Sequence, residues 1–583
     1  MTLLLGLCSL VVLSACTAPS ENSTSDANRD TAQAKLSAKS TPKENANVIL
    51  ILADDLGYTD VVSFAEKVSG IARQDQFYET PNIDALADQG LSFTHAYVNP
   101  LCSPTRASLL TGKPAVSMGF TTATSFRSTS YYGAGQTPPK GMHPLDVIEH
   151  KDKISIEQAL INARTITGLP AGTELDNGKD ELTYAELMTR HKNAFLGKWH
   201  LGGHGTPGYQ PQHQGFEELS FFDGGASSFF NYQKMWNTKR LFQDREDKQE
   251  RASGKWESLQ ADKEAKPYLT DALTDEAEAY IRQRAKDGKP FTLFLSHFAV
   301  HAPIQAKKAD TDYFAAKPQL GTKGQDNPTY AAMVKSLDDS VGQIVKTLYE
   351  TGLDENTYII FMSDNGGVDW LLRGSPTPPT SNQPFTGGKA TVYEGGVRVP
   401  LVIWKKGMHY AQDVSTSIDV TDIMPTLLDL GGYQVDSYNN IKGMAGQSLV
   451  PFLSDTQNTK GTYTKDTIYW YYPFNVIVNN PKDGLPVTPH AAIKKGDYKL
   501  IVNYHGSYAL YNVMQDIGEK NDLAAQKPEL ANRMFTELVG WIDQNAAKQY
   551  RPLLNSDYNP DNDAHAEPFK LLPQLEAVCC ETD

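Results

Sequence analysis

Short apolar runs that end abruptly in polar residues constrain this chain more than any other feature of its sequence. The run NVILILADD at 47–55 ends in two carboxylates, and YIIFMSDNGG at 358–367 ends in Asp-Asn-Gly-Gly. TLFLSHF at 292–298 and PLVIW at 400–404 have the same apolar character. Such runs are typical of strands that are buried on both faces and carry functional groups at their carboxyl ends. They predict a sheet with a site along one edge.

Segments with helical character lie between these runs, at 78–90, 105–112, 273–286 and 330–352. The last one keeps apolar residues at helical spacing over about six turns. Alternation of buried strands with helices predicts an α/β fold, in which a mixed or parallel sheet is covered by helices on both faces.

The pattern changes from about residue 462. TIYWYYPF, HAAIKKGDYKLIVNY and SYALYNV are short aromatic and β-branched runs joined by turns, and they predict a small antiparallel sheet. A helical segment follows at 527–548. We therefore expect a main domain at 47–461 and a smaller C-terminal α+β subdomain at 462–583.

The first sixteen residues, MTLLLGLCSLVVLSAC, form an apolar segment that is typical of an export signal and too short for a permanent membrane helix. LSAC at 13–16 resembles the lipobox of bacterial lipoproteins, which makes Cys16 the predicted site of lipidation; an ordinary secretory signal is the alternative. Residues 17–46 are polar and low in aromatics, which predicts a flexible tether. We expect an exported protein, in the periplasm or at the cell surface, that meets the membrane only through a lipid anchor.

Net charge and cysteine usage narrow the function classes. The formal net charge of −15 argues against nucleic acid as a partner, but a local cationic pocket could still bind an anionic substrate. Cys8 and Cys16 belong to the leader, and the sequence leaves the state of Cys579 and Cys580 open. Cys102 has no obvious disulfide partner in an oxidising compartment, so it is either deeply buried or chemically used.

Two pairs of polar residues end apolar runs and carry compatible chemistry. Asp54 and Asp55 follow the first run, and Asp364 and Asn365 follow the run at 358–363. Either pair alone is most often a turn. Together they supply three carboxylates and an amide oxygen, a hard-oxygen set that suits Ca²⁺ or Mg²⁺.

Basic residues recur in glycine-rich or strand-end positions of the same chain. Taken singly, each is more often a surface or structural residue. Together they would surround a divalent cation with positive charge, which suits a multi-oxygen anion such as sulfate or phosphate. The set comprises Arg106, Lys198, His200, His297, His301 and Lys389.

Cys102 lies just before Pro104, which can open a helix whose N-terminus would favour an anion. A thiolate nucleophile is one interpretation, but phosphatase loops of that kind need five residues between cysteine and arginine, and here there are three. A thiolate metal ligand is another, and it is mismatched to a hard-oxygen site. An oxygen nucleophile would suit the site better than sulfur.

The stretch CSPTRASLLTG resembles the signature of the type I sulfatases, C-x-P-[ST]-R. Further motifs of that family follow the same order around it: ADDLGY, GKWHLG, HAP, SDNGG, GGK and EGGVRVP. The ending GDYKLI…YALYNVMQDIGEKNDLA is similar to the family's C-terminal subdomain. The resemblance spans roughly residues 46–550. It implies the alkaline-phosphatase-like α/β fold, with a central mixed sheet flanked by helices, and makes 47–461 the catalytic domain.

The resemblance also implies the chemistry of residue 102. A formylglycine-generating, sulfatase-maturing enzyme would oxidise Cys102 to formylglycine, whose aldehyde hydrates to a gem-diol. Asp54, Asp55, Asp364 and Asn365 would bind one Ca²⁺ together with residue 102. One hydroxyl of the diol would then attack sulfur in line.

Roles for the basic residues follow from the same resemblance. His301 would protonate the leaving oxygen, with Lys389 beside it. Arg106 and Lys198 would fix residue 102 and neutralise charge on the sulfate. His200 would take a proton from the second hydroxyl, after which sulfate leaves and the aldehyde is restored. His297 is expected to be a partner of His301.

The resemblance implies a sulfate ester as substrate, and an exported lipoprotein would meet sulfated polysaccharide or its oligosaccharides. Residues 203–265 and the region around His490 are candidates for shaping the sugar site, although core packing is the alternative for most of their aromatic residues. Two other functions remain open. One is a formylglycine-dependent phosphodiesterase or phosphonate hydrolase on the same fold; the other is a non-catalytic glycan-binding lipoprotein.

Overall fold

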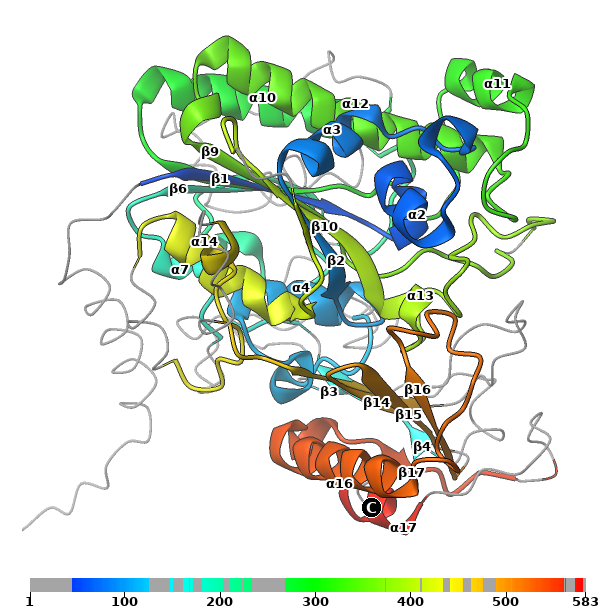
Figure 1. The fold of residues 1–583 in the computed structure, drawn as a ribbon. Helices are drawn as coiled ribbons and strands as arrows, with labels where there is room; N and C mark the ends of the chain where they lie inside the picture. The colour runs from blue at the N-terminus through cyan, green and yellow to red at the C-terminus, as the bar shows by residue number, and fades with distance from the viewer. Residues whose placement is uncertain are drawn as a thin grey trace, which may run out of the picture.

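The computed structural model describes residues 45–124, 147–149, 161–166, 168–170, 181–202, 209–222, 224–232, 268–372, 374–408, 412–433, 441–453, 463–474, 489–504, 506–559, 561 and 572–579. Within these residues, nine strands form the central sheet of the main domain (Figure 1). The strand order is β11-β2-β10-β9-β1-β8-β6-β7, and β12 also pairs with β2. The strands are β1 (Asn47–Ala53), β2 (Leu91–Tyr97), β6 (Lys192–Lys198), β7 (Glu218–Phe222), β8 (Phe291–Ser296), β9 (Thr357–Ser363), β10 (Arg398–Trp404), β11 (Gln412–Val414) and β12 (Ile418–Asp419).

Strand direction brings the ends of several chain segments to one edge of this sheet. β1 is parallel to both β8 and β9, and β6 is parallel to both β8 and β7. β10 runs antiparallel to β9 and to β2. The carboxyl ends of β9, β1, β8, β6 and β2 therefore share an edge with the beginning of β10.

Helices cover both faces of the sheet, as Figure 1 shows. Side chains of β1 alternate between two cores. Leu50 and Leu52 pack into the core beside α4, α7 and α14, while Ile49 and Ile51 pack into the core beside α3, α10 and α12. This double burial explains the unbroken apolar runs of the sequence. The helices of the main domain are α2 (Val62–Ser69), α3 (Pro81–Gln89), α4 (Cys102–Thr111), α7 (Tyr184–Leu187), α10 (Leu269–Asp287), α11 (Lys308–Ala316), α12 (Pro328–Thr351), α13 (Glu394–Val397) and α14 (Ile423–Leu430).

A second, four-stranded antiparallel sheet forms the C-terminal part of the chain. Its order is β13 (Thr467–Tyr472), β14 (His490–Lys495), β15 (Tyr498–Asn503) and β16 (Ser507–Asn512). α16 (Pro528–Asn545) covers one face, where Leu538 and Ile542 join Ile493 and Leu500 in one core. The opposite face packs on the main domain, with Trp470 in the same core as Val397.

Smaller elements complete the description. β3 (Val147–Glu149) pairs with β5 (Arg164–Ile166), and β4 (Ile161–Asn162) pairs with β17 (Leu553–Leu554). α17 (Pro573–Cys579) lies near the end of the chain. Among the described helices, we find none with the length and apolar character needed to cross a bilayer.

The predicted fold class is confirmed: a mixed sheet is flanked by helices, and an antiparallel sheet forms a separate smaller layer. The helix predicted at 105–112 begins earlier than expected, at Cys102, so Pro104 lies within its first turn. The predicted domain boundary at 461/462 lies outside the described residues, as do Cys16, most of the tether at 17–46 and Cys580.

Candidate active site

Four oxygen-bearing side chains meet where β1 and β9 end. Asp54 and Asp55 follow β1, and Asp364 and Asn365 follow β9, with all four side chains buried. The backbone N–H of Asp55 donates to Oδ1 of Asp364 at 3.2 Å. The Nδ2 group of Asn365 donates to Oδ1 of Asp55 at 2.8 Å. Asp55 has a φ of 62°, a left-handed conformation that costs free energy in a non-glycine residue and is common at functional sites.

Cys102 reaches the same place from the carboxyl end of β2. It is the first residue of α4, it is buried, and its Sγ lies 3.6 Å from Oδ1 of Asp54. Ligand atoms of Asp54, Asp55, Cys102 and Asp364 all lie within 4.8 Å of one another. Burial, followed by the charge of Asp364, raises the pKa of the Cys102 thiol to about 12. The unmodified thiol therefore stays protonated at neutral pH.

Lys198 and Arg106 place positive charge against the carboxylates of Asp54 and Asp364. These buried groups form the floor of the cluster. Nζ of Lys198 lies 2.8 and 2.7 Å from the two oxygens of Asp54. Arg106 donates to Oδ2 of Asp364 from Nε at 3.1 Å and from Nη2 at 2.9 Å. Both basic side chains are at most 1 % exposed. Because two of its nitrogens donate to Asp364, the arginine holds the strand ends in place.

Sequence reasoning missed Ser296, the last residue of β8. Nη1 of Arg106 donates to Oγ of Ser296 at 2.6 Å and to the backbone oxygen of Lys198 at 2.8 Å. The Ser296 hydroxyl itself donates to that Lys198 oxygen at 2.7 Å. The ends of β6 and β8 are thus tied to α4. A serine ending an apolar run has no signal that distinguishes it from an ordinary turn residue.

His301 and Lys389 lie on the more open side of the cluster, against Asp55. Nζ of Lys389 is 2.6 Å from Oδ1 of Asp55, and Nε2 of His301 is 3.6 Å from Oδ2. Their side chains are 18 % exposed for His301 and 12 % for Lys389, whereas the groups at the floor are closed to solvent. A substrate would therefore meet these two side chains first.

His200 lies beyond the end of β6, again with a left-handed φ of 53°. Its Nε2 is 3.1 Å from the backbone oxygen of Thr124. Since a carbonyl oxygen only accepts, Nε2 must carry the proton and Nδ1 must present a lone pair. Nδ1 is buried and has no hydrogen-bond partner among the described residues. Burial lowers the pKa of His200 well below its ordinary value, with Lys198 adding to the shift, so the imidazole is neutral.

Two other histidines form contacts that the sequence does not predict. His297 does not hydrogen-bond His301; its Nε2 is 3.0 Å from Oγ of Ser340 on α12. His490 is buried on β14, where Nε2 accepts the backbone N–H of Val392 at 3.2 Å. That bond supports the loop that follows Lys389. Of the segment 203–265, the residues at 209–222 and 224–232 are described, and Phe221 and Phe222 are core residues.

The buried oxygen ligands of the cluster are compatible with a cation site. Burial raises the pKa of Asp54 above its ordinary value; Lys198 opposes the rise, and Asp364 and Asp55 add to it. Burial also pushes the pKa of Asp55 upward, but Lys389 and His301 outweigh it and hold the pKa low. Oδ1 of Asn365 is buried without a hydrogen-bond partner among the described residues. A divalent cation would relieve both the crowding of carboxylates and the unpaired oxygen.

Comparison with known proteins decides the family. A model of the sulfatase family matches residues 46–152 and 155–433. The chain belongs to the sulfatase family. A second family model, N-sulphoglucosamine sulphohydrolase, C-terminal, matches residues 387–544 of this sulfatase. The described part of this second match includes the antiparallel sheet.

Curated relatives and solved structures agree with this assignment. A sulfatase of Formosa agariphila is 29 % identical over 87 % of this chain and 91 % of its own length. The N-acetylgalactosamine-6-sulfatase of Rattus norvegicus is 31 % identical over 68 % of this chain and 64 % of its own length. The crystal structure of Ps i-CgsB in complex with k-i-k-neocarrahexaose has a TM-score of 0.62 at 27 % identity, covering 86 % of this chain and 94 % of that one. This sulfatase is thus a sulfuric ester hydrolase.

Proposed function

We propose that this sulfatase removes sulfate from a sulfated carbohydrate, with residue 102 as its nucleophile after oxidation to formylglycine and with one Ca²⁺ in the site. The observation that carries the proposal is the position of Cys102. Its sulfur lies with three carboxylates in a cluster whose ligand atoms are within 4.8 Å of one another. Hard oxygen donors suit a divalent cation, and a soft thiolate is mismatched to such a site.

The cation would be held by Asp54, Asp55, Asp364 and Asn365. These residues offer only oxygen ligands, the preference of Ca²⁺. The unpaired Oδ1 of Asn365 supports the assignment, because a buried acceptor without a partner is costly. When bound, the cation supplies charge that polarises a sulfate oxygen.

Conversion of Cys102 is proposed because an oxygen nucleophile fits the hard-oxygen cluster better than sulfur does. A hydrated formylglycine supplies a hydroxyl as nucleophile and a second hydroxyl for sulfate release. This step makes a sulfatase-maturing enzyme a required partner. Cys102 is buried in the folded chain, so we expect the modification to precede folding.

Proton transfer to the leaving alcohol is assigned to His301, with Lys389 beside it. Both side chains contact Asp55 and retain the exposure that the floor of the cluster lacks. The carbohydrate part of the substrate must point toward that open side, since Asp54, Asp364 and Arg106 close the other. The two basic groups therefore stand where the leaving oxygen would lie.

Two further groups act on the sulfate side. Lys198 places a positive charge at the floor of the cluster, where charge on the sulfate oxygens grows during reaction. His200 is proposed as the base, because its tautomer leaves Nδ1 with an unshared lone pair. Arg106 acts through Asp364, whose carboxylate it holds with two hydrogen bonds.

A carbohydrate is proposed as substrate on the strength of the relatives. N-acetylgalactosamine-6-sulfatases of five mammals are 29–31 % identical to this chain. The Ps i-CgsB structure at 27 % identity is a complex with neocarrahexaose. From the motif at 13–16 alone, we further propose export with lipidation of Cys16.

Two measurements test the proposed function. Mass spectrometry of the peptide around residue 102 should find formylglycine in active enzyme; full activity with an unmodified thiol would exclude that nucleophile. Sulfate release should then be measured from k-i-k-neocarrahexaose, from a hexasaccharide carrying N-acetylgalactosamine 6-sulfate, and from an aryl sulfate. A phosphate diester serves as the comparison substrate. Faster cleavage of the diester than of every sulfate ester would contradict the proposal.

A further inference from the structure

A cavity separate from the catalytic cluster lies between the two parts of the molecule. It has a volume of about 250 Å³ and is walled by α4, by the 3-10 helix η3 (Ala115–Met118), by the segment 419–421 and by β13 with α16. None of the catalytic residues named above lines it. Ser108 on α4 reaches the cavity, about 9 Å along the helix axis from Cys102.

One wall of the cavity is aromatic and rigid. The rings of Tyr469 on β13 and Trp541 on α16 stack at 4.7 Å between centroids and at 5° to each other. The hydroxyl of Tyr469 donates to Oε1 of Glu537 at 3.0 Å, which fixes the pair. Both aromatic side chains retain partial exposure. Flat, pre-ordered apolar surfaces of this kind pack against the C–H face of a sugar ring at little entropic cost.

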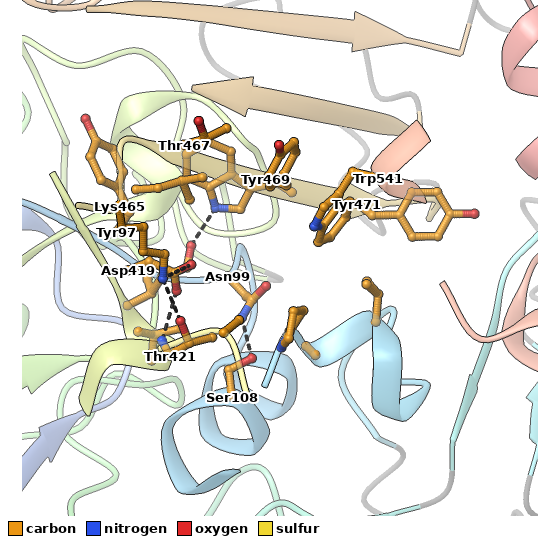
Figure 2. A pocket seen from close by; sticks show the side chains of 18 residues that line it. Tyr97, Asn99, Ser108, Asp419, Thr421, Lys465, Thr467, Tyr469, Tyr471 and Trp541 are labelled. Carbon is orange, nitrogen blue, oxygen red and sulfur yellow. Dashed lines mark hydrogen bonds and ion pairs between the residues drawn. The ribbon is translucent and has the colours of Figure 1, made fainter. Parts of the chain in front are cut away.

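The opposite wall carries a polar side chain that can form further hydrogen bonds. Nδ2 of Asn99 is a long 3.4 Å from Oγ of Ser108, and no contact of its Oδ1 is found among the described residues. In Figure 2 the amide nitrogen of Asn99 faces Ser108, and the amide oxygen points away from Ser108. Among the described strands, β13 lies at an edge of its four-stranded sheet, and edge strands in general carry backbone groups outside the hydrogen-bonded ladder.

The single basic side chain among the described lining residues, Lys465, is already paired with carboxylates. Nζ of Lys465 donates to Oγ1 of Thr421 at 2.8 Å and lies 3.1 Å from Oδ2 of Asp419 (Figure 2). It also lies 3.1 Å from Oδ1 of Asp422. An ammonium group has three donors, and here all three are engaged. No positive charge is left for a sulfate group. Both walls therefore suit a neutral ligand that is rich in hydroxyl groups.

We propose that this cavity is a second carbohydrate subsite, which binds one unsulfated sugar residue of a polymeric or oligomeric substrate away from the reacting sulfate. The proposal rests on the proposed carbohydrate function. The volume of about 250 Å³ falls below the ~300–1,000 Å³ of pockets for drug-sized ligands, which limits the occupant to about one ring. Its effect is to hold the chain of sugars, so it contributes to binding and leaves the chemical step alone.

Two substitutions test the subsite by different routes. Trp541→Ala removes the stacking surface, and Thr467→Tyr fills the cavity from β13 without removing any core side chain. Tyr349→Ala, an exposed aromatic on α12, is the matched control. Thermal melting checks that each variant folds. Each is assayed with an aryl sulfate and with whichever of the two sulfated hexasaccharides the wild type desulfates.

Both variants should raise the KM for the hexasaccharide at least fivefold and leave its kcat, and all kinetics on the aryl sulfate, within twofold of wild type. The desulfated form of the same hexasaccharide should bind the wild type and bind both variants at least fivefold more weakly. An unchanged KM and unchanged binding in either folded variant overturns the subsite. Hydrolysis of the aryl sulfate alone, with both hexasaccharides untouched, would instead contradict the proposed function.

Discussion

Nζ of Lys499 lies 3.0 Å from Oε1 of Glu394, and neither side chain is exposed. The lysine belongs to the C-terminal sheet, and the glutamate begins α13, five residues beyond Lys389. Glu519 adds a second carboxylate at 3.0 Å from the same ammonium group. The C-terminal subdomain is thereby joined, through a buried ion cluster, to the segment that carries a candidate catalytic lysine.

Lys499→Met should destabilise the protein by about 3–5 kcal/mol, because it leaves Glu394 and Glu519 buried without a counter-charge. Denaturant unfolding measures the loss. Lys495→Met is the control, since Lys495 is 44 % exposed in its pair with Glu537 and such surface pairs contribute at most about 1 kcal/mol. Equal stability of the two variants would show that the buried cluster is dispensable.

Lys198→Ala and His301→Ala should each lower turnover of a sulfate ester at least about a hundredfold, as expected for the loss of one preorganised charge or proton donor. Lys192→Ala is a matched control. Lys192 begins β6, the strand that Lys198 ends, and it forms an exposed ion pair with Glu217 at the end of β6 that lies away from the cluster. Near-wild-type turnover in a variant removes that residue from the mechanism.

Asn365→Leu should weaken the binding of Ca²⁺ about tenfold or more, since leucine has the shape of asparagine without its oxygen. Added Ca²⁺ should raise the melting temperature of the wild type, because a ligand of the native state stabilises it; the rise should shrink in the variant. Asn356→Leu, at an exposed position, should respond like the wild type. A full calcium response in Asn365→Leu would contradict the assigned ligand.

His191 predicts a loss of stability in acid. Burial lowers its pKa to about 4 in the folded chain, against about 6.5 when unfolded. Between these values the unfolded chain binds a proton that the folded chain does not, so the free energy of unfolding falls as pH decreases from about 6.5 to 4. His191→Gln should flatten this dependence by up to about 1.4 kcal/mol per pH unit, measured by denaturant unfolding at several pH values. An unchanged slope would show that His191 titrates normally.

Much of the catalytic cluster was predictable because its residues follow apolar strands directly in the sequence. Asp54 and Asp364 are each one residue beyond a buried run, and parallel strands must end at a common edge. The direction of β10 was not predictable, since PLVIW has the same apolar character in either orientation. It is this antiparallel strand that brings the loop containing Lys389 to the edge.

Partnerships across long sequence distances could not be predicted from the sequence. Lys499 and Glu394 are 105 residues apart, and each alone has the appearance of a surface residue. His490 is a second example, because nothing in the sequence predicts that its Nε2 accepts the backbone N–H of Val392, 98 residues away. Only packing distinguishes such a structural histidine from a binding one.

The register of the central sheet has a consequence for how the enzyme can change. Ala53 pairs with Ser363, and Leu52 pairs with Ser296, so each catalytic segment departs from a fixed rung of one hydrogen-bonded ladder. A shift of the strand register by one residue would move the residue that follows the strand by about 3.3 Å and turn its side chain to the opposite face of the sheet. The carboxylates of Asp54 and Asp364, one residue beyond Ala53 and Ser363, are therefore placed by the sheet itself and do not depend on the long connections between strands. Those connections can lengthen, shorten or exchange sequence to accommodate a different sugar, while the machinery that handles the sulfate keeps the same coordinates.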